Sequence, residues 1–136
     1  MRTVRLDNEA ITALADAAHH KHRLVVAHLA GVAVRRRKGT AARVMVATAV
    51  RVDAGWDRSE PGAAAINRYP VAYVFLDAGT ADVAAGIVNR TGVSVADAHI
   101  GAVAHSLAGD QVVVLTSDPD NMVRVSTPRP ITAVRI

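Results

Sequence analysis

Residues 94–121 read SVADAHIGAVAHSLAGDQVVVLTSDPDN, and this stretch decides the fold. Its first half predicts a helix, because apolar residues recur at steps of four, three and four on one helical stripe, namely Ala96, Ile100, Val103 and Leu107. Gly109 ends that helix, since glycine commonly follows a last helical turn. Residues 111–115 then predict a strand covered on both faces, and Pro119 stops further strand pairing. The stretch therefore predicts one helix–strand unit of an α/β sheet, with acidic residues at the carboxyl end of the strand.

Strand and helix patterns alternate along the rest of the chain. We predict strands at 3–6, 43–48, 70–76 and 131–136, and helices at 9–15, 21–38, 49–56, 61–67, 81–89 and 121–125. Thr80 is expected to cap the helix at 81–89. One side of the helix at 21–38 is predicted to carry Leu24, Ala27, His28, Gly31 and Val34. Such alternation favours a mostly parallel sheet with helices on both faces.

Length and composition limit the class of protein. The chain has 136 residues, which predicts a single domain spanning 1–136. It has no cysteine, which excludes disulfides, thiolate catalysis and Cys-ligated zinc and agrees with a cytoplasmic location. No signal peptide pattern begins the chain, and no apolar run approaches the ~20 residues of a membrane helix, so no membrane association is expected. The net charge of +4 permits a polyanionic partner.

Three aspartates occupy positions where a strand meets a helix or a helix begins. Asp7 follows the first strand, Asp97 lies in the first turn of the helix at 94–107, and Asp118 follows the strand at 111–115. Each has a structural interpretation as a helix cap, since aspartate accepts hydrogen bonds from free amides of a first helical turn. Each also has a functional interpretation, because ligands of open α/β sheets gather at the carboxyl ends of the strands.

Convergence of these acids would make a metal site. Mg²⁺ and Mn²⁺ prefer carboxylate and water oxygens, and usually take only a few protein ligands. Neighbouring carboxylates repel one another and raise each other's pKa, and a divalent cation cancels that repulsion. Such a cation can also assist phosphodiester hydrolysis.

Three segments carry a resemblance to a known family. Leu6-Asp7-Asn8, Val95-Ala96-Asp97-Ala98-His99-Ile100 and Val114-Leu115-Thr116-Ser117-Asp118-Pro119-Asp120 resemble the PIN domain, and more narrowly the VapC-type ribonuclease toxins of bacterial toxin–antitoxin systems. In order and spacing the resemblance covers nearly the whole chain. It implies a PIN-like three-layer α/β/α sandwich with a central, mostly parallel five-stranded sheet.

The same resemblance implies an activity, a cofactor and partners. The expected activity is metal-dependent endoribonuclease cleavage of RNA, with Mg²⁺ or Mn²⁺ as cofactor. The expected partners are the RNA substrate, a small VapB-type antitoxin that inhibits the toxin, and a second copy in a homodimer. The alternative is a catalytically weak or inactive PIN-like module that binds RNA or a protein partner.

The resemblance also assigns the catalytic and metal-binding residues. It carries over to Asp7, Asp97 and Asp118, with the hydroxyls of Thr116 and Ser117 beside them. The family's glutamate after the second strand is replaced here by Asp53, which is shorter by one methylene. Asp57 lies one helical turn further on and is the other candidate for this position, and Asp120 is a further candidate acid.

Two other clusters have both a structural and a functional interpretation. His19-His20-x-His22 matches no zinc-binding spacing and is interpreted as solvated, and His99 and His105 are expected to be structural. Arg35-Arg36-Arg37-Lys38 is either a solvated helix end or a contact to RNA phosphates. The chain has only four aromatic residues, which argues against a base-stacking platform.

Overall fold

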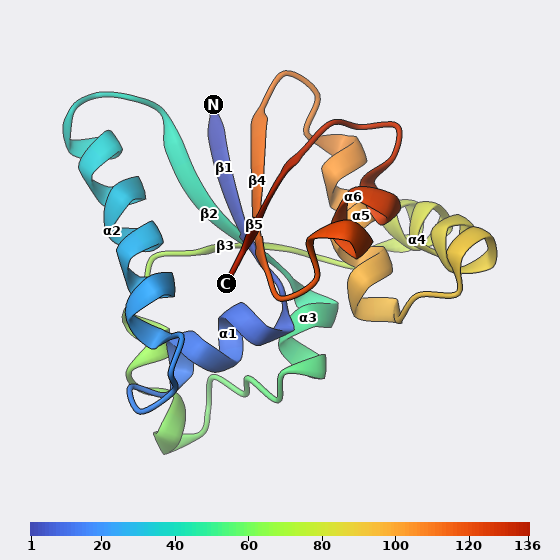
Figure 1. Ribbon diagram of the computed structural model, residues 1–136. Coiled ribbons are helices and arrows are strands. Elements are labelled where there is room, and N and C mark those ends of the chain that lie inside the picture. The colour runs from blue at the N-terminus through green and yellow to red at the C-terminus, as the bar shows by residue number, and fades with distance from the viewer.

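The computed structural model describes residues 1–136 as five parallel strands between two layers of helices (Figure 1). The elements are, in order, β1 (Arg2–Leu6), α1 (Asn8–Ala15), α2 (His22–Arg37), β2 (Ala42–Ala47), α3 (Thr48–Asp53), the 3₁₀ turns η1 (Pro61–Ala63) and η2 (Ile66–Arg68), β3 (Ala72–Val74), α4 (Ala78–Thr91), α5 (Val95–Ser106), β4 (Gln111–Thr116), α6 (Pro119–Ser126) and β5 (Thr132–Arg135). The predicted three-layer α/β/α architecture is confirmed.

The strands are arranged in the order β3-β2-β1-β4-β5, and every pair is parallel. The chain moves outward from β1 through β2 to β3, then returns and adds β4 on the other side of β1. Right-handed crossovers therefore place α1 and α2 on one face and α4, α5 and α6 on the other, as Figure 1 shows. The strand order reverses between β1 and β4, and open α/β sheets bind ligands at such a switch point.

The core is aliphatic, as the shortage of aromatics requires. The strands β1, β2 and β4 are almost wholly buried, and α5 buries Ala96 and the seven consecutive residues from Ala98 to Ala104. The predicted stripe is buried along its whole length, including Leu107 at the end of the helix. Gly101 of α5 faces α6 so closely that a Cβ atom there would lie 2.9 Å from the carbonyl carbon of Val125. The close approach fixes α5 against α6, and with it the position of Asp97.

Several elements differ from the sequence prediction. The strand expected at 70–76 is reduced to β3, and the helix expected at 61–67 is two 3₁₀ turns. Asp77, not Thr80, caps α4: its carboxylate accepts a hydrogen bond from the Thr80 amide, so the helix begins three residues earlier than predicted.

The side of α2 predicted from the sequence is mostly exposed. The helix instead buries Val25, Leu29 and Val32. Apolar residues lie all around α2, so its sequence pattern does not single out one face.

Candidate functional site

Asp7 lies at the switch point between β1 and β4. Its backbone amide donates to the Leu115 carbonyl (3.2 Å), which continues the β1–β4 pairing by one residue. Its carboxylate accepts hydrogen bonds from the amides of Ala10 (2.8 Å) and Ser117 (3.1 Å), so it both caps α1 and joins the ends of the two strands. Burial raises the pKa of Asp7, an effect opposed by these bonds and by the Thr116 hydroxyl. Asp7 is only 6% exposed, and these hydrogen bonds offset only part of the cost of burying its charge.

Asp97 lies in the first turn of α5, half-buried, and faces the same end of the sheet. Burial raises its pKa first, and the negative charge of Asp7 raises it further, with a smaller contribution from Asp53. The Asn121 side-chain amide donates to its Oδ2 at 2.8 Å, which opposes that rise. Ser94 caps α5 by accepting from the Asp97 amide at 3.1 Å. The effect of Asp7 on the pKa of Asp97 places the two carboxylates within electrostatic reach of one another.

Asp53 ends α3 and borders the same acidic region. It is exposed, and its Oδ2 accepts a hydrogen bond from the Asn8 side-chain amide at 2.5 Å. Asp57 is directed elsewhere, because its Oδ1 accepts from the amide (2.9 Å) and hydroxyl (2.6 Å) of Ser59. Of the two candidates for this position, Asp53 is the one that affects the pKa of Asp97.

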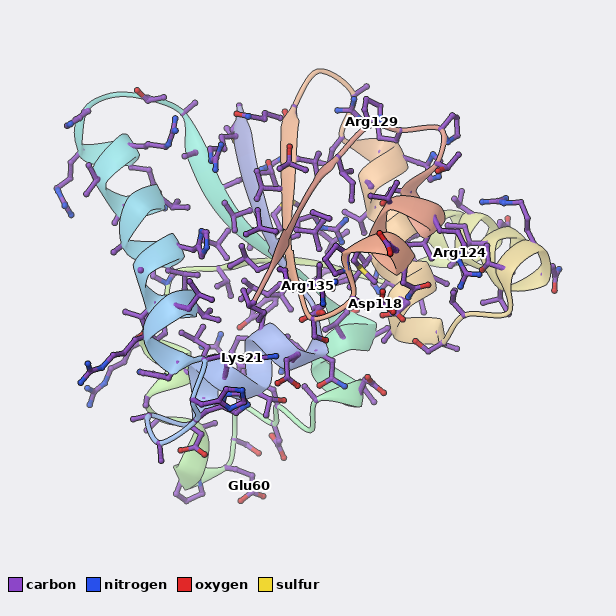
Figure 2. The ribbon with its side chains drawn as sticks, viewed as in Figure 1. Lys21, Glu60, Asp118, Arg124, Arg129 and Arg135 are labelled. Atoms are coloured by element: carbon purple, nitrogen blue, oxygen red, sulfur yellow. The ribbon has the colours of Figure 1, made fainter.

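Asp118 follows β4 directly and caps α6. Its Oδ1 accepts from the Asn121 amide at 3.2 Å, and Pro119 occupies the first helical position. The Asp118 amide donates to the Thr116 hydroxyl at 2.9 Å, and Thr116 in turn contacts Asp7. The side chain is exposed at the carboxyl end of β4, near Arg135, as Figure 2 shows. The capping interpretation of Asp118 is confirmed, and its carboxylate retains a free oxygen.

The spacing of these acids limits the kind of metal site that they can form. No three His, Asp or Glu side chains are arranged closely enough to hold one ion together. Mg²⁺, however, commonly uses one or two carboxylates and completes its shell with water and substrate phosphate. The pair Asp7 and Asp97 meets that requirement in ligand chemistry and in mutual repulsion, with Asp53 and Asp118 beside it. A four-carboxylate site remains a prediction.

The sequence did not indicate four polar residues that contribute to this site. Asn8 binds Asp53, Asn121 binds Asp97, Arg124 donates to the Asn121 side-chain oxygen (2.9 Å), and Arg135 donates to the Ser117 carbonyl (3.1 Å). The sequence does contain a signal for Asn121: it follows the helix-capping Asp118 by three positions, which predicts that it lies in the first turn of the helix beside that aspartate. The contacts of Asn8, Arg124 and Arg135 depend on tertiary packing and leave no local pattern.

A buried cation lies beneath the site. Arg5 of β1 is fully buried, and its Nη1 donates to the Ile100 carbonyl of α5 at 2.5 Å, while Nε and Nη2 have no partner. Burial lowers the pKa of Arg5 to about 9. His99 is also buried, and burial followed by the charge of Arg5 lowers its pKa. The structural role predicted for His99 agrees with this burial.

The other histidine cluster forms no metal site. His19 makes an ion-pair contact with Glu9 (3.3 Å) and stacks on His20, and the His22 ring contacts the Ala13 carbonyl (2.9 Å). These contacts hold the α1–α2 connection.

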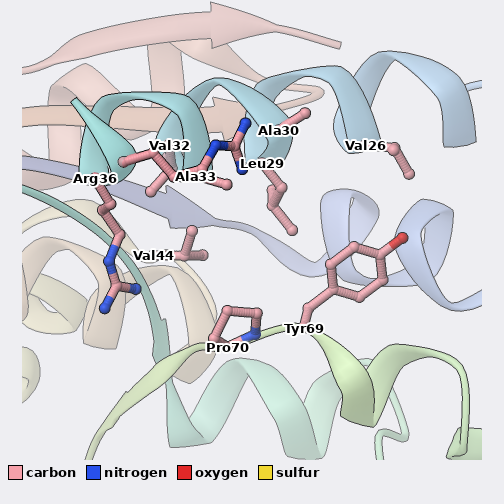
Figure 3. Close-up of a pocket in the computed structure, with 10 residues that line it drawn as sticks. Val26, Leu29, Ala30, Val32, Ala33, Arg36, Val44, Tyr69 and Pro70 are labelled. Carbon is pink, nitrogen blue, oxygen red and sulfur yellow. The ribbon is translucent and has the colours of Figure 1, made fainter.

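An apolar groove lies on another part of the molecule. It has a volume of about 500 Å³ and runs between α2 and the Tyr69-Pro70 segment, with Arg36 and Arg37 at one end. Figure 3 shows Leu29 and Ala33 of α2 facing Tyr69 and Pro70 across it.

A five-stranded parallel sheet with paired carboxylates at its switch point is the architecture of a PIN-like fold. Solved structures bear out the fold. VapC20 of Mycobacterium tuberculosis, described as a toxin that cleaves the sarcin–ricin loop, is 21% identical, with a TM-score of 0.57 over 87% of this chain and 92% of its own. VapBC2 of Rickettsia felis, solved with a DNA fragment from its promoter, is 9% identical, with a TM-score of 0.59 over 98% of both chains.

The resemblance to VapC-type PIN domains is therefore confirmed at the level of the fold. No protein-family model and no curated protein matches the sequence. No helix has the length and apolar character needed to cross a membrane.

Proposed function

We propose that this protein is a metal-dependent endoribonuclease toxin that hydrolyses RNA phosphodiester bonds in the cytoplasm and is neutralised by a VapB-type antitoxin. The observation that carries the proposal is the pairing of Asp7 and Asp97 at the switch point of the sheet, where each carboxylate has a raised pKa. Functional sites commonly hold acids with perturbed pKa values, and two repelling carboxylates favour a bound cation. The likeness of the fold to VapC20, described as a toxin that cleaves the sarcin–ricin loop, supports a nuclease activity.

In this proposal Asp7 and Asp97 hold Mg²⁺ or Mn²⁺, with Asp53 and Asp118 as additional ligands directly or through water. The bound cation would supply Lewis-acid polarisation of a phosphodiester and of the attacking water. The chain orients the carboxylates: the amides of Ala10 and Ser117 hold Asp7, and Asn121 holds Asp97. Asp53 and Asp118 would accept a proton from water, a role that their exposure to solvent permits.

A cleavage assay tests the activity. Purified protein is incubated with total cellular RNA in EDTA, Mg²⁺ or Mn²⁺, beside the matched variant Asp97→Asn. The proposal expects cleavage by the wild type only with a divalent cation, and none by the variant. Cleavage that is insensitive to EDTA, or that persists in Asp97→Asn, would contradict it.

The alternative function is an RNA- or protein-binding module with weak or no catalysis. Two observations favour it: no three acids are arranged to hold an ion together, and Asp53 stands where the family has a longer glutamate. RNA binding by the wild type without metal-dependent cleavage would support this alternative. Asp53→Glu then provides a further test, since restored reach should raise cleavage if the short side chain limits the activity.

We propose that the antitoxin docks in the groove between α2 and Tyr69-Pro70. Its apolar lining is suited to the apolar face of a helical segment, and Arg36 and Arg37 would pair with acidic residues of that segment. The variant Ala33→Glu places a carboxylate in the groove (Figure 3) and should reduce co-purification of the co-expressed antitoxin. Ala27→Glu, at an exposed position of the same helix that does not line the groove, serves as the matched control.

We propose a homodimer whose interface includes Phe75, which directly follows β3 and is 71% exposed. Aromatic side chains are enriched at protein–protein interfaces. Sedimentation velocity should give a dimer for the wild type and a monomer for Phe75→Glu, and a wild-type monomer at micromolar concentration would exclude this interface.

A further inference from the structure

Two arginines beside α3 are held against the same aromatic ring. The guanidinium carbon of Arg51 lies 4.7 Å from the centre of the Tyr73 ring and 5.2 Å from that of Trp56. The guanidinium carbon of Arg58 lies 5.5 Å from the Tyr73 ring, and its Nη1 donates to the Tyr73 hydroxyl. Cation–π contacts of this kind fix a guanidinium in place without neutralising its charge.

Neither arginine has a carboxylate partner within 4 Å. The buried Nε of Arg51 has no hydrogen-bond partner, and its Nη2 makes only a long contact (3.4 Å) to the Trp56 carbonyl. Asp57 lies nearby, but its Oδ1 is already occupied by Ser59. Two cations and one carboxylate leave an excess of one positive charge in the cluster, together with unused donors.

Arg51, Trp56 and Asp57 line a hollow that adjoins the acidic site, and Arg58 lies next to Asp57 in the chain. The hollow has a volume of about 410 Å³ and is lined by Thr48, Arg51, Val52, Gly55, Trp56 and Asp57. A second hollow of about 520 Å³ shares Thr48 and Val52 with it and reaches Asp53, Ser94 and Ala96, next to Asp97. The two hollows therefore border one another between Asp53 and Arg51.

The loop that carries Arg58 is tied down by side-chain hydrogen bonds. The Trp56 indole donates to the side-chain oxygen of Asn67 (2.9 Å), and the Asn67 side-chain nitrogen donates to the Arg58 carbonyl (2.9 Å). The donors are thus positioned in advance, which lowers the entropic cost of binding a ligand.

We propose that Arg51 and Arg58 form a phosphate-binding subsite for the RNA strand that passes the acidic site. This inference rests on the proposed function, because it concerns the same substrate. Guanidinium groups bind phosphate oxygens through N–H donors, and in Arg51 the Nε is unpartnered and Nη2 makes only the long contact to the Trp56 carbonyl. The mainly apolar hollow between subsite and acids is lined by Ala49, Leu76 and Val95 and accommodates a nucleobase. The subsite and this hollow then hold the strand on one side of the bond to be cleaved.

Trp56 allows the subsite to be observed directly. It is the only tryptophan in the chain and lines the hollow, so its fluorescence reports occupancy there. The full chain is titrated in EDTA with a single-stranded, 2′-O-methylated RNA of mixed sequence at several salt concentrations. The wild type should show a change in Trp56 emission and a salt-dependent Kd. The variant Arg51→Met/Arg58→Met should bind ~10-fold more weakly, and the slope of log K against log salt should fall by about 1.4, the value for two phosphates on a single strand.

A control double variant and a single variant distinguish phosphate binding at Arg51 and Arg58 from a general effect of positive charge on RNA affinity. Arg23→Met/Arg90→Met removes two exposed charges that line neither hollow and should leave the Trp56 response and slope near wild type. Arg58→Met alone alters only an exposed side chain, so the fold should persist, and it should lower the slope by about 0.7.

Each outcome separates the subsite from the nuclease activity. Equal losses in both double variants, or an unchanged Kd in Arg51→Met/Arg58→Met, would overturn the subsite. Binding that depends on Arg51 and Arg58 without cleavage in Mn²⁺ would uphold the subsite and refute the nuclease. Cleavage in Mn²⁺ by a protein whose RNA affinity does not depend on Arg51 or Arg58 would uphold the nuclease and refute the subsite.

Discussion

The side-chain amide of Asn121 donates to Oδ2 of Asp97 at 2.8 Å, and its own oxygen accepts from Arg124 at 2.9 Å. Because only the nitrogen of this amide can donate, the bond from Arg124 fixes which way the amide faces. The backbone amide of Asn121 also binds Asp118. One residue of α6 thus orients a carboxylate of α5 and donates its backbone amide to Asp118, the cap of its own helix.

We predict that Asn121→Leu raises the pKa of Asp97. The amide stabilises the ionised carboxylate, so removing it favours the protonated form. The acidic limb of the pH–rate profile should move to higher pH, and cleavage in Mn²⁺ should fall ~10–100-fold, as is common when a residue that orients a metal ligand is lost. Arg124→Met keeps the amide and should cause a smaller loss. An unmoved acidic limb in Asn121→Leu would show that this contact does not affect the ionisation.

Asp97→Asn should raise the melting temperature of the metal-free protein at neutral pH. The folded-state pKa of Asp97 lies above its ordinary value of 3.8, so the folded protein binds more protons than the unfolded chain just above that pH. Stability is therefore lost as the pH rises through this window, and an uncharged side chain avoids the loss. The measurement is thermal unfolding in EDTA at pH 4, 5 and 7, where the gain should grow with pH.

The matched control for this measurement is Asp118→Asn. Asparagine also caps helices, so this exposed position should change little in EDTA. With Mn²⁺ added, Asp97→Asn should show a smaller stabilisation by metal than the wild type. A lower melting temperature for Asp97→Asn in EDTA would mean that this carboxylate serves the fold and not an ion.

The fold was predictable where local signals agree. In residues 94–121 the helical stripe, the glycine stop, the apolar strand and the proline all indicate the same elements, and the structure has them. The prediction failed where signals compete. Asp77 and Thr80 both resemble helix caps, and the apolar residues of α2 do not favour one face.

The site was predictable in its acids but not in the groups that orient them. Asp7 and Asp97 carry recognisable sequence patterns, whereas the contacts that hold them are made across the fold, from Ser117 to Asp7 and from Asn121 to Asp97. Arg5 was missed for a different reason. A charged residue in a strand normally indicates a solvent-facing position, and only tertiary packing places this one beneath α5.

Arg5→Met should stabilise the protein at neutral pH. The folded-state pKa of Arg5 is lowered by burial to about 9, so below pH 9 the fold bears the full cost of a buried charge without a carboxylate partner. Between pH 9 and the ordinary pKa of arginine the unfolded chain binds more protons, and stability rises with pH. Methionine of similar volume should add about 1–4 kcal/mol at pH 7, roughly 4 °C in melting temperature per kcal/mol.

Thermal unfolding at pH 7 and pH 10 checks the prediction for Arg5. The gain in melting temperature from Arg5→Met should be smaller at pH 10, because the wild-type guanidinium is then largely deprotonated. Arg2→Met, at a half-buried position of the same strand, is the control and should show no such pH dependence. A loss of stability in Arg5→Met at pH 7 would mean that its bond to Ile100 outweighs the burial of the charge.

Gly101→Ala tests the close packing that positions Asp97. A Cβ atom at Gly101 would lie 2.9 Å from the Val125 carbonyl carbon and 3.0 Å from a methyl group of Ile87, so α5 must move away from α6. Overpacking of this kind costs about 1–3 kcal/mol. Because α6 carries Asn121, the same shift should lengthen its bond to Asp97 and lower cleavage beyond the loss of stability.

The matched control for this substitution is Gly86→Ala in α4. Gly86 is also helical but has open space around it, so alanine there should stabilise by about 0.5–1 kcal/mol through the backbone alone. Urea unfolding of the two variants should therefore give opposite signs against the wild type. If both variants stabilise, the α5–α6 contact is loose enough to accept a methyl group, and the position of Asp97 must be fixed by Ser94 and Asn121 rather than by helix packing.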